Sequence, residues 1–279
     1  MHLIKDHRFG DVRGFELGYG PIGRPLMTVY FYFVDGLLID TGQHHMQRQA
    51  LQLVEKLSPI HRILITHHHE DHSGNAAAFQ NATGASLGAH PLTAAKLRSG
   101  FRILPYQRLV WGRAPVADPK PLPPRILSDH VTLVPLHTPG HSRDHMAFFE
   151  PDRGWLFAGD LFIGERIKFF RTDEDIHAQI ASLRNVRQLA FEALFCAHNP
   201  CTTGGLEKIS AKLDFLEVLR GRVRELRARG LAEKEIIARL DPRRDRFVKW
   251  FTMGNASFAN MVRSALKPEK PATDNFLSI

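Results

Sequence analysis

The chain has 279 residues, of which 43% are hydrophobic and 24% are charged, and its formal net charge is +8 at pH 7. This length can bury a large core, so we expect one large domain or two unequal ones. There is no run of 18 apolar residues and no secretory signal core, so we expect no membrane span and a cytoplasmic location. Two cysteines, Cys196 and Cys201, are too few for a disulfide framework.

The first hundred residues contain both strand-like and helix-like patterns. Residues 27–34 and 36–40 predict a β-hairpin, with Asp35-Gly36 as the turn. The further elements predicted before residue 99 are a helix at 47–57, a strand at 62–65, a helix at 73–79, a strand at 85–89 and a helix at 91–97.

Residues 99–124 differ from the sequence before them, because six prolines and three aromatic residues fall in this segment. Proline removes backbone donors, so regular structure is not expected here. Loops of this length are often functional lids. We hypothesise that the segment is a lid-like insertion over the active site, in which Tyr106 and Trp111 contact the substrate. A surface loop held down by its aromatic residues is the alternative.

The second part of the chain returns to regular patterns. The elements predicted there are strands at 131–136, 146–150 and 155–158, a helix at 173–189 with acidic residues in its first turn, and a strand at 193–197. Strands and helices alternate, but hairpins also occur. A mixed α/β (α+β) fold, with two sheets flanked by helices, therefore fits better than a doubly wound sheet.

The last part of the chain is helical and basic. Helices are predicted at 206–229, 231–240 and 247–266, with Gly254 weakening the middle of the third. Residues 206–270 contain 16 Lys and Arg against 9 Asp and Glu, which gives +7. This excess indicates either an anionic partner or a solvated, arginine-rich helix face. We predict a catalytic domain at 1–205 and a basic helical domain at 206–279.

Four candidate metal ligands fall within six residues, directly after the apolar strand at 62–65. They are His67, His69, Asp71 and His72, in the spacing H-x-H-x-D-H. Imidazole and carboxylate groups are ligands for zinc, iron and manganese. On an extended segment, residues two positions apart point the same way, so the first two histidines can share one metal.

Three later motifs each place a histidine or an aspartate just after a strand-like run. They are centred on His141, Asp160 and His198. Strands that deliver ligands to one rim of a sheet can build a rigid metal site. The cluster at residues 67–72 is therefore interpreted as part of a larger site rather than as a solvated loop.

This ordered set resembles the metallo-β-lactamase superfamily, and within it the glyoxalase II-like branch, over roughly residues 10–205. The resemblance implies a four-layer αβ/βα sandwich with a C-terminal helical extension. It also implies two divalent metal ions, most simply zinc, with iron or manganese as alternatives. By this resemblance the first metal is held by His67, His69 and His141, the second by Asp71, His72 and His198, and Asp160 bridges both.

A dinuclear site of this kind holds a bridging water and lowers its pKa toward neutrality. We therefore expect a metal-dependent hydrolase that uses a metal-bridging hydroxide on a small ester, thioester or related substrate. Asp71 is a ligand that could also orient or receive the proton of the water. In the family, an aspartate at the position of Asp40 hydrogen-bonds a ligand histidine from outside the ligand shell. His68, inside the motif, is expected to point away from the metals.

The substrate is left open by the sequence. Lys168 matches a lysine with which glyoxalase II holds glutathione, but Phe170 supplies no tyrosine hydroxyl there. A β-lactamase is disfavoured, because lactamases of the superfamily lack the bridging carboxylate matched by Asp160. We expect a small-molecule substrate and no membrane partner. The alternatives are a phosphodiester hydrolase that binds RNA with its basic helices, a mononuclear iron enzyme like the persulfide dioxygenases, and a binding protein without turnover.

Overall fold

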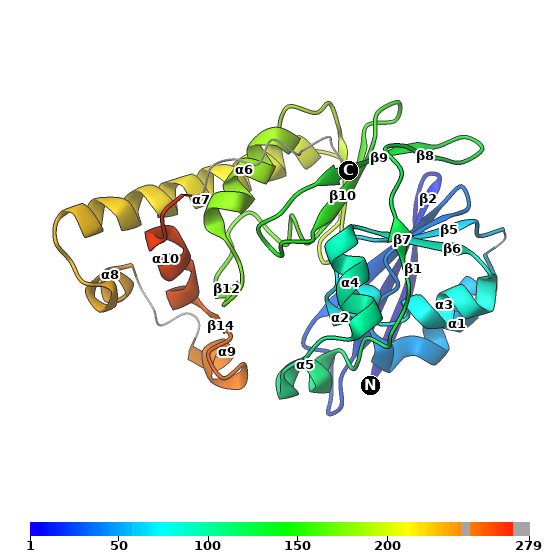
Figure 1. The fold of residues 1–279 in the computed structure, drawn as a ribbon, viewed down its shortest axis with the longest axis horizontal. Coiled ribbons are helices and arrows are strands. Elements are labelled where there is room, and N and C mark those ends of the chain that lie inside the picture. Colours follow the sequence, from blue (N-terminus) through cyan, green and yellow to red (C-terminus); the bar gives the residue numbers. More distant parts are fainter. Residues whose placement is uncertain (58, 241–245, 270–279) are drawn as a thin grey trace.

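The computed structural model describes residues 1–57, 59–240 and 246–269. Two sheets pack against each other, and helices cover the outer face of each (Figure 1). The apolar core between the sheets joins residues of both, such as Tyr32 and Leu64 from one and Phe148 and Phe157 from the other. The predicted four-layer αβ/βα sandwich is thus confirmed.

The first sheet has seven strands in sequence order. They are β1 (His2–Phe9), β2 (Val12–Tyr19), β3 (Thr28–Val34), β4 (Leu37–Ile39), β5 (Arg62–Ile65), β6 (Ser86–Ala89) and β7 (Lys120–Pro121). Strands β1 to β4 are antiparallel neighbours, and β4 to β7 are parallel. Asp35 and Gly36 both have positive φ, 48° and 75°, as the predicted two-residue hairpin turn requires.

Helices α1 (Gln47–Val54), α3 (Ala76–Thr83) and α4 (Pro91–Ser99) cover the outer face of this sheet (Figure 1). The single helix predicted at 73–79 is wrong. A short helix α2 (Glu70–Ser73) begins inside the predicted metal-ligand motif. It ends at Gly74, and α3 begins two residues later. A β-carbon at Gly74 would lie 2.7 Å from the backbone nitrogen of His44, so the two segments meet there at a distance that only glycine permits.

The expectation that residues 99–124 lack regular structure is corrected by helix α5 (Pro105–Val110). Pro105 occupies the first turn of this helix, where a missing backbone N–H costs nothing because no acceptor lies within the helix. Gln107 closes the turn by accepting a hydrogen bond from the backbone N–H of Leu104, at 2.8 Å. Most of the segment outside α5 and β7 has no helix or strand.

The second sheet has the order β13-β11-β10-β9-β8. Its strands are β8 (Ile126–Leu127), β9 (Thr132–His137), β10 (Met146–Glu150), β11 (Trp155–Gly159) and β13 (Ala193–Cys196). Helix α6 (Ile176–Val186) packs on its outer face. The helix was predicted to start at Asp173, but Asp175 is its N-cap and accepts hydrogen bonds from the backbone of residues 177 and 178. The two preceding acids therefore lie outside the helix.

Most of the chain after the second sheet packs on the same side as α6. Its elements are α7 (Gly205–Ala228), α8 (Glu233–Arg239), α9 (Arg246–Phe251), β14 (Ala256–Ser257) and α10 (Phe258–Leu266). The single helix predicted at 247–266 is wrong. Met253 and Gly254 have positive φ, and β14 pairs with β12 (Phe170–Arg171). Parts of the predicted basic domain, 241–245 and 270–279, lie outside the described residues.

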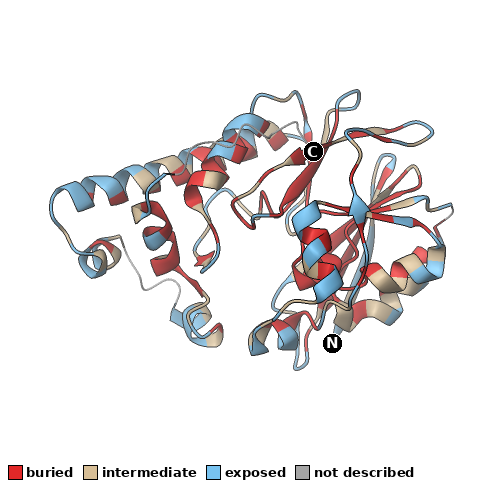
Figure 2. Cartoon of the chain, viewed as in Figure 1, coloured by how far each residue is buried: buried red, intermediate tan, exposed pale blue. Residues whose placement is uncertain are grey.

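Burial follows this layering (Figure 2). The strands and the inner faces of the helices are buried, whereas the outer face of α7 and much of α8 and α9 are exposed. Among the described residues, no helix combines the length and the hydropathy that a membrane crossing requires.

Candidate metal centre

All seven predicted ligands come together at one rim of the sandwich, because each follows the end of a strand. The H-x-H-x-D-H motif follows β5, His141 lies in the turn between β9 and β10, Asp160 follows β11, and His198 follows β13. Six of the seven side chains belong to buried residues, and His198 is half-buried. Three groups of these residues have ligand atoms within 4.8 Å of one another. Two of the groups share no residue, and the third, His67, His72 and Asp160, overlaps both through its histidines.

The first group contains His67, His69 and His141. Nδ1 of His69 lies 2.8 Å from Nε2 of His67 and 3.0 Å from Nε2 of His141. Two ligands of a tetrahedral zinc ion, each about 2.1 Å from the metal, lie about 3.4 Å apart. The three ring nitrogens therefore converge on one point and need only a few tenths of an ångström of opening to hold an ion.

The second group contains Asp71, His72 and His198. Oδ2 of Asp71 lies 3.8 Å from Nε2 of His72 and 3.7 Å from Nε2 of His198. The motif switches from extended chain to helix α2 at Glu70. That change of conformation separates the two ligand groups, because Asp71 and His72 leave the helix in a direction different from that of His67 and His69.

Asp160 lies between the two groups. Its Oδ1 is 3.4 Å from Nε2 of His72 and 3.3 Å from Nε2 of His198, and its Oδ2 is 3.3 Å from Nε2 of His141. These separations match those of ligands around a shared tetrahedral ion. Nε2 of His72 and Oδ1 of Asp160 are buried without a hydrogen-bond partner. Such orphaned lone pairs are costly unless a cation satisfies them.

The outer nitrogens of the second group are held by fixed acceptors. Nδ1 of His72 donates to Oδ2 of Asp40 at 2.7 Å, and Nδ1 of His198 donates to the carbonyl of Thr28 at 2.7 Å. Asp40 has φ 61° and accepts a 2.8 Å hydrogen bond from the backbone of Thr66. These contacts select the tautomer that leaves Nε2 free for a metal.

Glu174 supports His141, a contact that the sequence did not predict. Its Oε2 lies 3.5 Å from Nδ1 of His141 and accepts a hydrogen bond from Gln179 at 2.7 Å. Gly140, just before the ligand, has φ 137°, and a β-carbon there would lie 2.4 Å from Gln179. The close approach of this turn to α6 brings His141 and Glu174 together.

His145 holds the backbone of Asp160, the predicted bridging residue. The backbone N–H of Asp160 donates to Nε2 of His145 at 3.0 Å, and Nδ1 of His145 faces Oγ1 of Thr138 at 2.8 Å. Burial, with the nearby His141, lowers the pKa of His145 to about 3. The ring is therefore neutral at pH 7, and its Nε2 lone pair is available to accept this hydrogen bond.

The protonation states around the centre are set by burial and by neighbouring charges. Burial lowers the pKa of both His67 and His69, which keeps their lone pairs free. Burial opposes the charge of Asp160, but His198, His72 and His141 outweigh it and lower the pKa of this carboxyl. Burial also opposes the charge of His72, but Asp40 and Asp160 outweigh it and raise its pKa. A cation bound at His72 must therefore displace a proton, so metal affinity will fall at low pH.

The three predicted substrate contacts are placed differently. The Trp111 ring is 6.4 Å from the His198 ring, beside the second ligand group. The Tyr106 hydroxyl accepts a hydrogen bond from Asn255 at 2.7 Å, so it faces the segment between α9 and β14. Lys168 is exposed on the segment before β12.

His68 points away from the centre, as expected from its place in the motif. Its Nδ1 lies 3.0 Å from the carboxylate of Asp144, which is buried and also accepts a hydrogen bond from Thr93 at 2.8 Å. Asp144 follows His141 by three residues. The pair therefore ties the segment that carries His67 and His69 to the turn that carries His141.

The fold and this rim define a class of proteins in which a four-layer αβ/βα sandwich carries a histidine and carboxylate cluster at the strand ends. The model of the metallo-beta-lactamase superfamily matches residues 25–198, which is more than half of the chain. The chain belongs to the metallo-β-lactamase superfamily.

Two relatives and one solved structure illustrate the similarity. The chain is 28% identical over 213 residues to the beta-lactamase-like protein 2 homolog of Caenorhabditis elegans, covering 74% of this chain and 64% of that protein. It is 26% identical over 141 residues to hydroxyacylglutathione hydrolase of Legionella pneumophila, covering 50% of this chain and 48% of that enzyme. The chain thus matches between about half and two thirds of the length of these relatives.

The structure resembles that of a metallo-beta-lactamase family protein from Thermus thermophilus. The TM-score is 0.64 at 21% identity, with 92% of both chains covered. This likeness concerns the fold, and it extends beyond the matched family region into the helices after residue 198.

Proposed function

We propose that this protein is a dinuclear metal-dependent hydrolase that cleaves a small ester or thioester. The observation that carries the proposal is the position of Asp160, whose two carboxylate oxygens face different histidine groups. One ion would be held by His67, His69 and His141, and the other by Asp71, His72 and His198. The relative named hydroxyacylglutathione hydrolase supports a thioester as the substrate.

Two bound divalent ions would lower the pKa of a water toward neutrality and polarise the substrate carbonyl. The protein supplies the arrangement around that chemistry. Asp71 has one oxygen directed at the second histidine group, which leaves it able to orient the attacking water and receive its proton. Trp111 is buried and lies beside His198, where its indole would keep bulk water from that side of the centre.

The two enzymatic alternatives have less support. A mononuclear iron enzyme needs only one ligand group, whereas the described residues contain a second group of similar compactness. An RNA hydrolase needs free cations on the basic helices. Several of those arginines are instead paired with acids, as in Arg220–Glu269, Arg229–Glu225 and Arg263–Glu233.

Elemental mass spectrometry on protein purified without added metal tests the dinuclear site. We expect about two ions per chain in the wild type and about one in His198→Ala. His130→Ala, which removes an exposed histidine at the opposite end of β9 from His141, is the matched control and should keep both ions. Hydrolysis is then measured as thiol release from thioesters of N-acetylcysteamine. One iron per chain together with oxygen consumption on a persulfide would refute the proposal, as would two ions without cleavage of any ester or thioester.

A further inference from the structure

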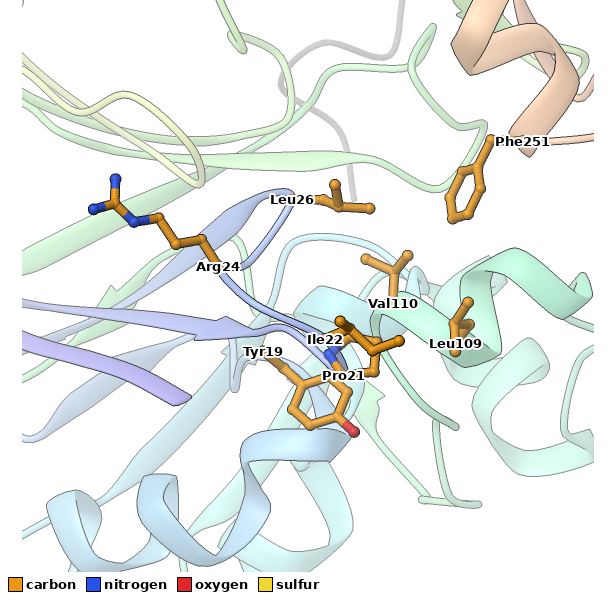
Figure 3. Close-up of a pocket in the computed structure, with 8 residues that line it drawn as sticks. All are labelled: Tyr19, Pro21, Ile22, Arg24, Leu26, Leu109, Val110 and Phe251. Atoms are coloured by element: carbon orange, nitrogen blue, oxygen red, sulfur yellow. The ribbon is translucent and has the colours of Figure 1, made fainter. Parts of the chain in front are cut away.

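An apolar hollow of about 200 Å³ lies between three segments that are far apart in the sequence (Figure 3). Its walls are Tyr19, Ile22 and Leu26 from β2 and the β2–β3 loop, Leu109 and Val110 from α5, and Phe251 from α9. Arg24 also lines the hollow, but its guanidinium extends away from the apolar side chains (Figure 3). The interior is therefore apolar.

The walls of the hollow expose large side chains to water. Ile22 is 95% exposed, Leu26 is 63% exposed and Leu109 is 49% exposed. Apolar surface in water is unfavourable by about 25 cal/mol per Å², and a cluster of such residues from separate segments marks a binding surface. The exposed leucines and isoleucine therefore gain free energy when an apolar group fills the space between them.

The hollow lies beside the candidate metal centre, because two of the segments that line it also carry residues that contact His198. Val110 precedes Trp111, whose ring is 6.4 Å from the ring of His198. The loop that carries Ile22 and Leu26 leads directly into Thr28, whose carbonyl accepts the 2.7 Å hydrogen bond from His198. Val110 and Leu26, which line the hollow, are therefore one and two positions along the chain from residues that contact His198.

Phe251, which lines the hollow from α9, is held in place against α5. The Phe251 ring lies 6.0 Å from the Tyr106 ring, and the Tyr106 hydroxyl accepts the 2.7 Å hydrogen bond from Asn255. These contacts fix α9 relative to α5. The volume of about 200 Å³ is below the ~300–1,000 Å³ of pockets that enclose a whole ligand, so the hollow suits one part of a substrate.

We propose that the hollow binds the aliphatic acyl chain of the substrate, which makes the protein selective for medium-length acyl esters or thioesters over acetyl ones. This inference rests on the proposed hydrolase function. An acyl group places its carbonyl at the metal centre and its chain past Trp111 toward Val110, Leu109 and Phe251. The leaving group then extends on the other side of the centre.

The test is a series of N-acetylcysteamine thioesters with acyl chains from two to ten carbons, so that only the acyl group changes. In the wild type, kcat/KM should rise about two- to fourfold per methylene and level off once the hollow is filled. Leu109→Ser and Phe251→Ala should flatten this rise, so that the ratio of kcat/KM for the longest acyl chain to kcat/KM for the acetyl thioester falls toward one. Leu92→Ser is the matched control, because Leu92 is 48% exposed on α4, does not line the hollow, and should keep the wild-type series.

Binding of ketone analogues, in which a methylene replaces the thioester sulfur, is measured in parallel by calorimetry. A Kd that falls with chain length in the wild type, but not in Leu109→Ser, supports the hollow even if no thioester is cleaved, in which case only the hydrolase proposal fails. Hydrolysis of all chain lengths at equal kcat/KM, with equal Kd values for the analogues, overturns the acyl-chain inference and leaves the hydrolase proposal standing. Chain-length dependence that persists in both hollow variants also overturns it.

Discussion

A buried lysine provides a prediction whose size follows from the structure. Lys212, on α7, is 1% exposed, and its Nζ donates to the carbonyl of Leu161 at 2.6 Å. Burial lowers the pKa of Lys212 from 10.5 to about 8, although Glu174 and Asp160 partly oppose the shift. This pKa shift corresponds to a cost of about 3 kcal/mol for burying the charged ammonium group, because one pKa unit is worth about 1.4 kcal/mol.

The sign follows from proton binding. Between pH 8 and 10.5 the unfolded chain keeps its proton on Lys212 while the folded chain loses it, so the unfolded state binds more protons and stability rises with pH. The cost of burying the cation is fully present below pH 8 and disappears by about pH 10.5. In Lys212→Met this cost is absent at every pH.

We therefore compare the free energies of unfolding of the wild type and Lys212→Met at two pH values. The value for the wild type minus the value for Lys212→Met should rise by about 2 kcal/mol from about pH 7 to about pH 9.5. Loss of the hydrogen bond to Leu161 shifts the two curves by a constant and does not change this slope. The measurement is urea unfolding of metal-free protein, followed by far-UV circular dichroism. Lys208→Met removes a partly exposed lysine from the same helix and controls for the loss of one positive charge. Parallel curves for the wild type and Lys212→Met would show that water or a counter-charge reaches the ammonium group, and would refute the argument.

Three other variants test the centre. Asp40→Asn should weaken metal binding about 10- to 100-fold by loosening His72, measured by competition with a chromogenic chelator, and unchanged affinity would remove Asp40 from the site. Asp71→Asn should keep some metal but lose most turnover in a thiol-release assay; near-wild-type activity would exclude a proton-accepting role. Gly140→Ala should lower the free energy of unfolding by about 2–3 kcal/mol, because its β-carbon would lie 2.4 Å from Gln179, and an unchanged urea midpoint would contradict that contact.

The fold and the cluster of seven ligands could be predicted because their signals are local. Each ligand directly follows an apolar run, and strand ends that meet at one rim bring such residues together. The hairpin turn at Asp35-Gly36 carries its own backbone signal. By contrast, β1 was not predicted. Most of its side chains are exposed, so its order of apolar and polar residues does not differ from that of a polar loop.

The supporting contacts could not be predicted, because they join residues whose partners are set by packing. Glu174 precedes α6 and was interpreted as an acid in the first turn of a helix, whereas it faces His141. His145 belongs to no spaced motif in the sequence, and it reaches Asp160 because β10, which it precedes, pairs with both β9 and β11. The break at Gly254 depends on the pairing of β14 with β12, a strand that lies far earlier in the sequence.

The same supporting contacts connect the helices after residue 205 to the metal centre. Lys212 donates to the carbonyl of Leu161, the residue after Asp160. Ser264, on α10, donates to the carbonyl of Glu174 at 3.1 Å and accepts from the backbone of Ile176 at 2.9 Å. Since Glu174 faces His141, α7 and α10 each fix one residue beside a predicted metal ligand. The helices therefore contribute to the geometry of the candidate centre through hydrogen bonds to these backbone carbonyls.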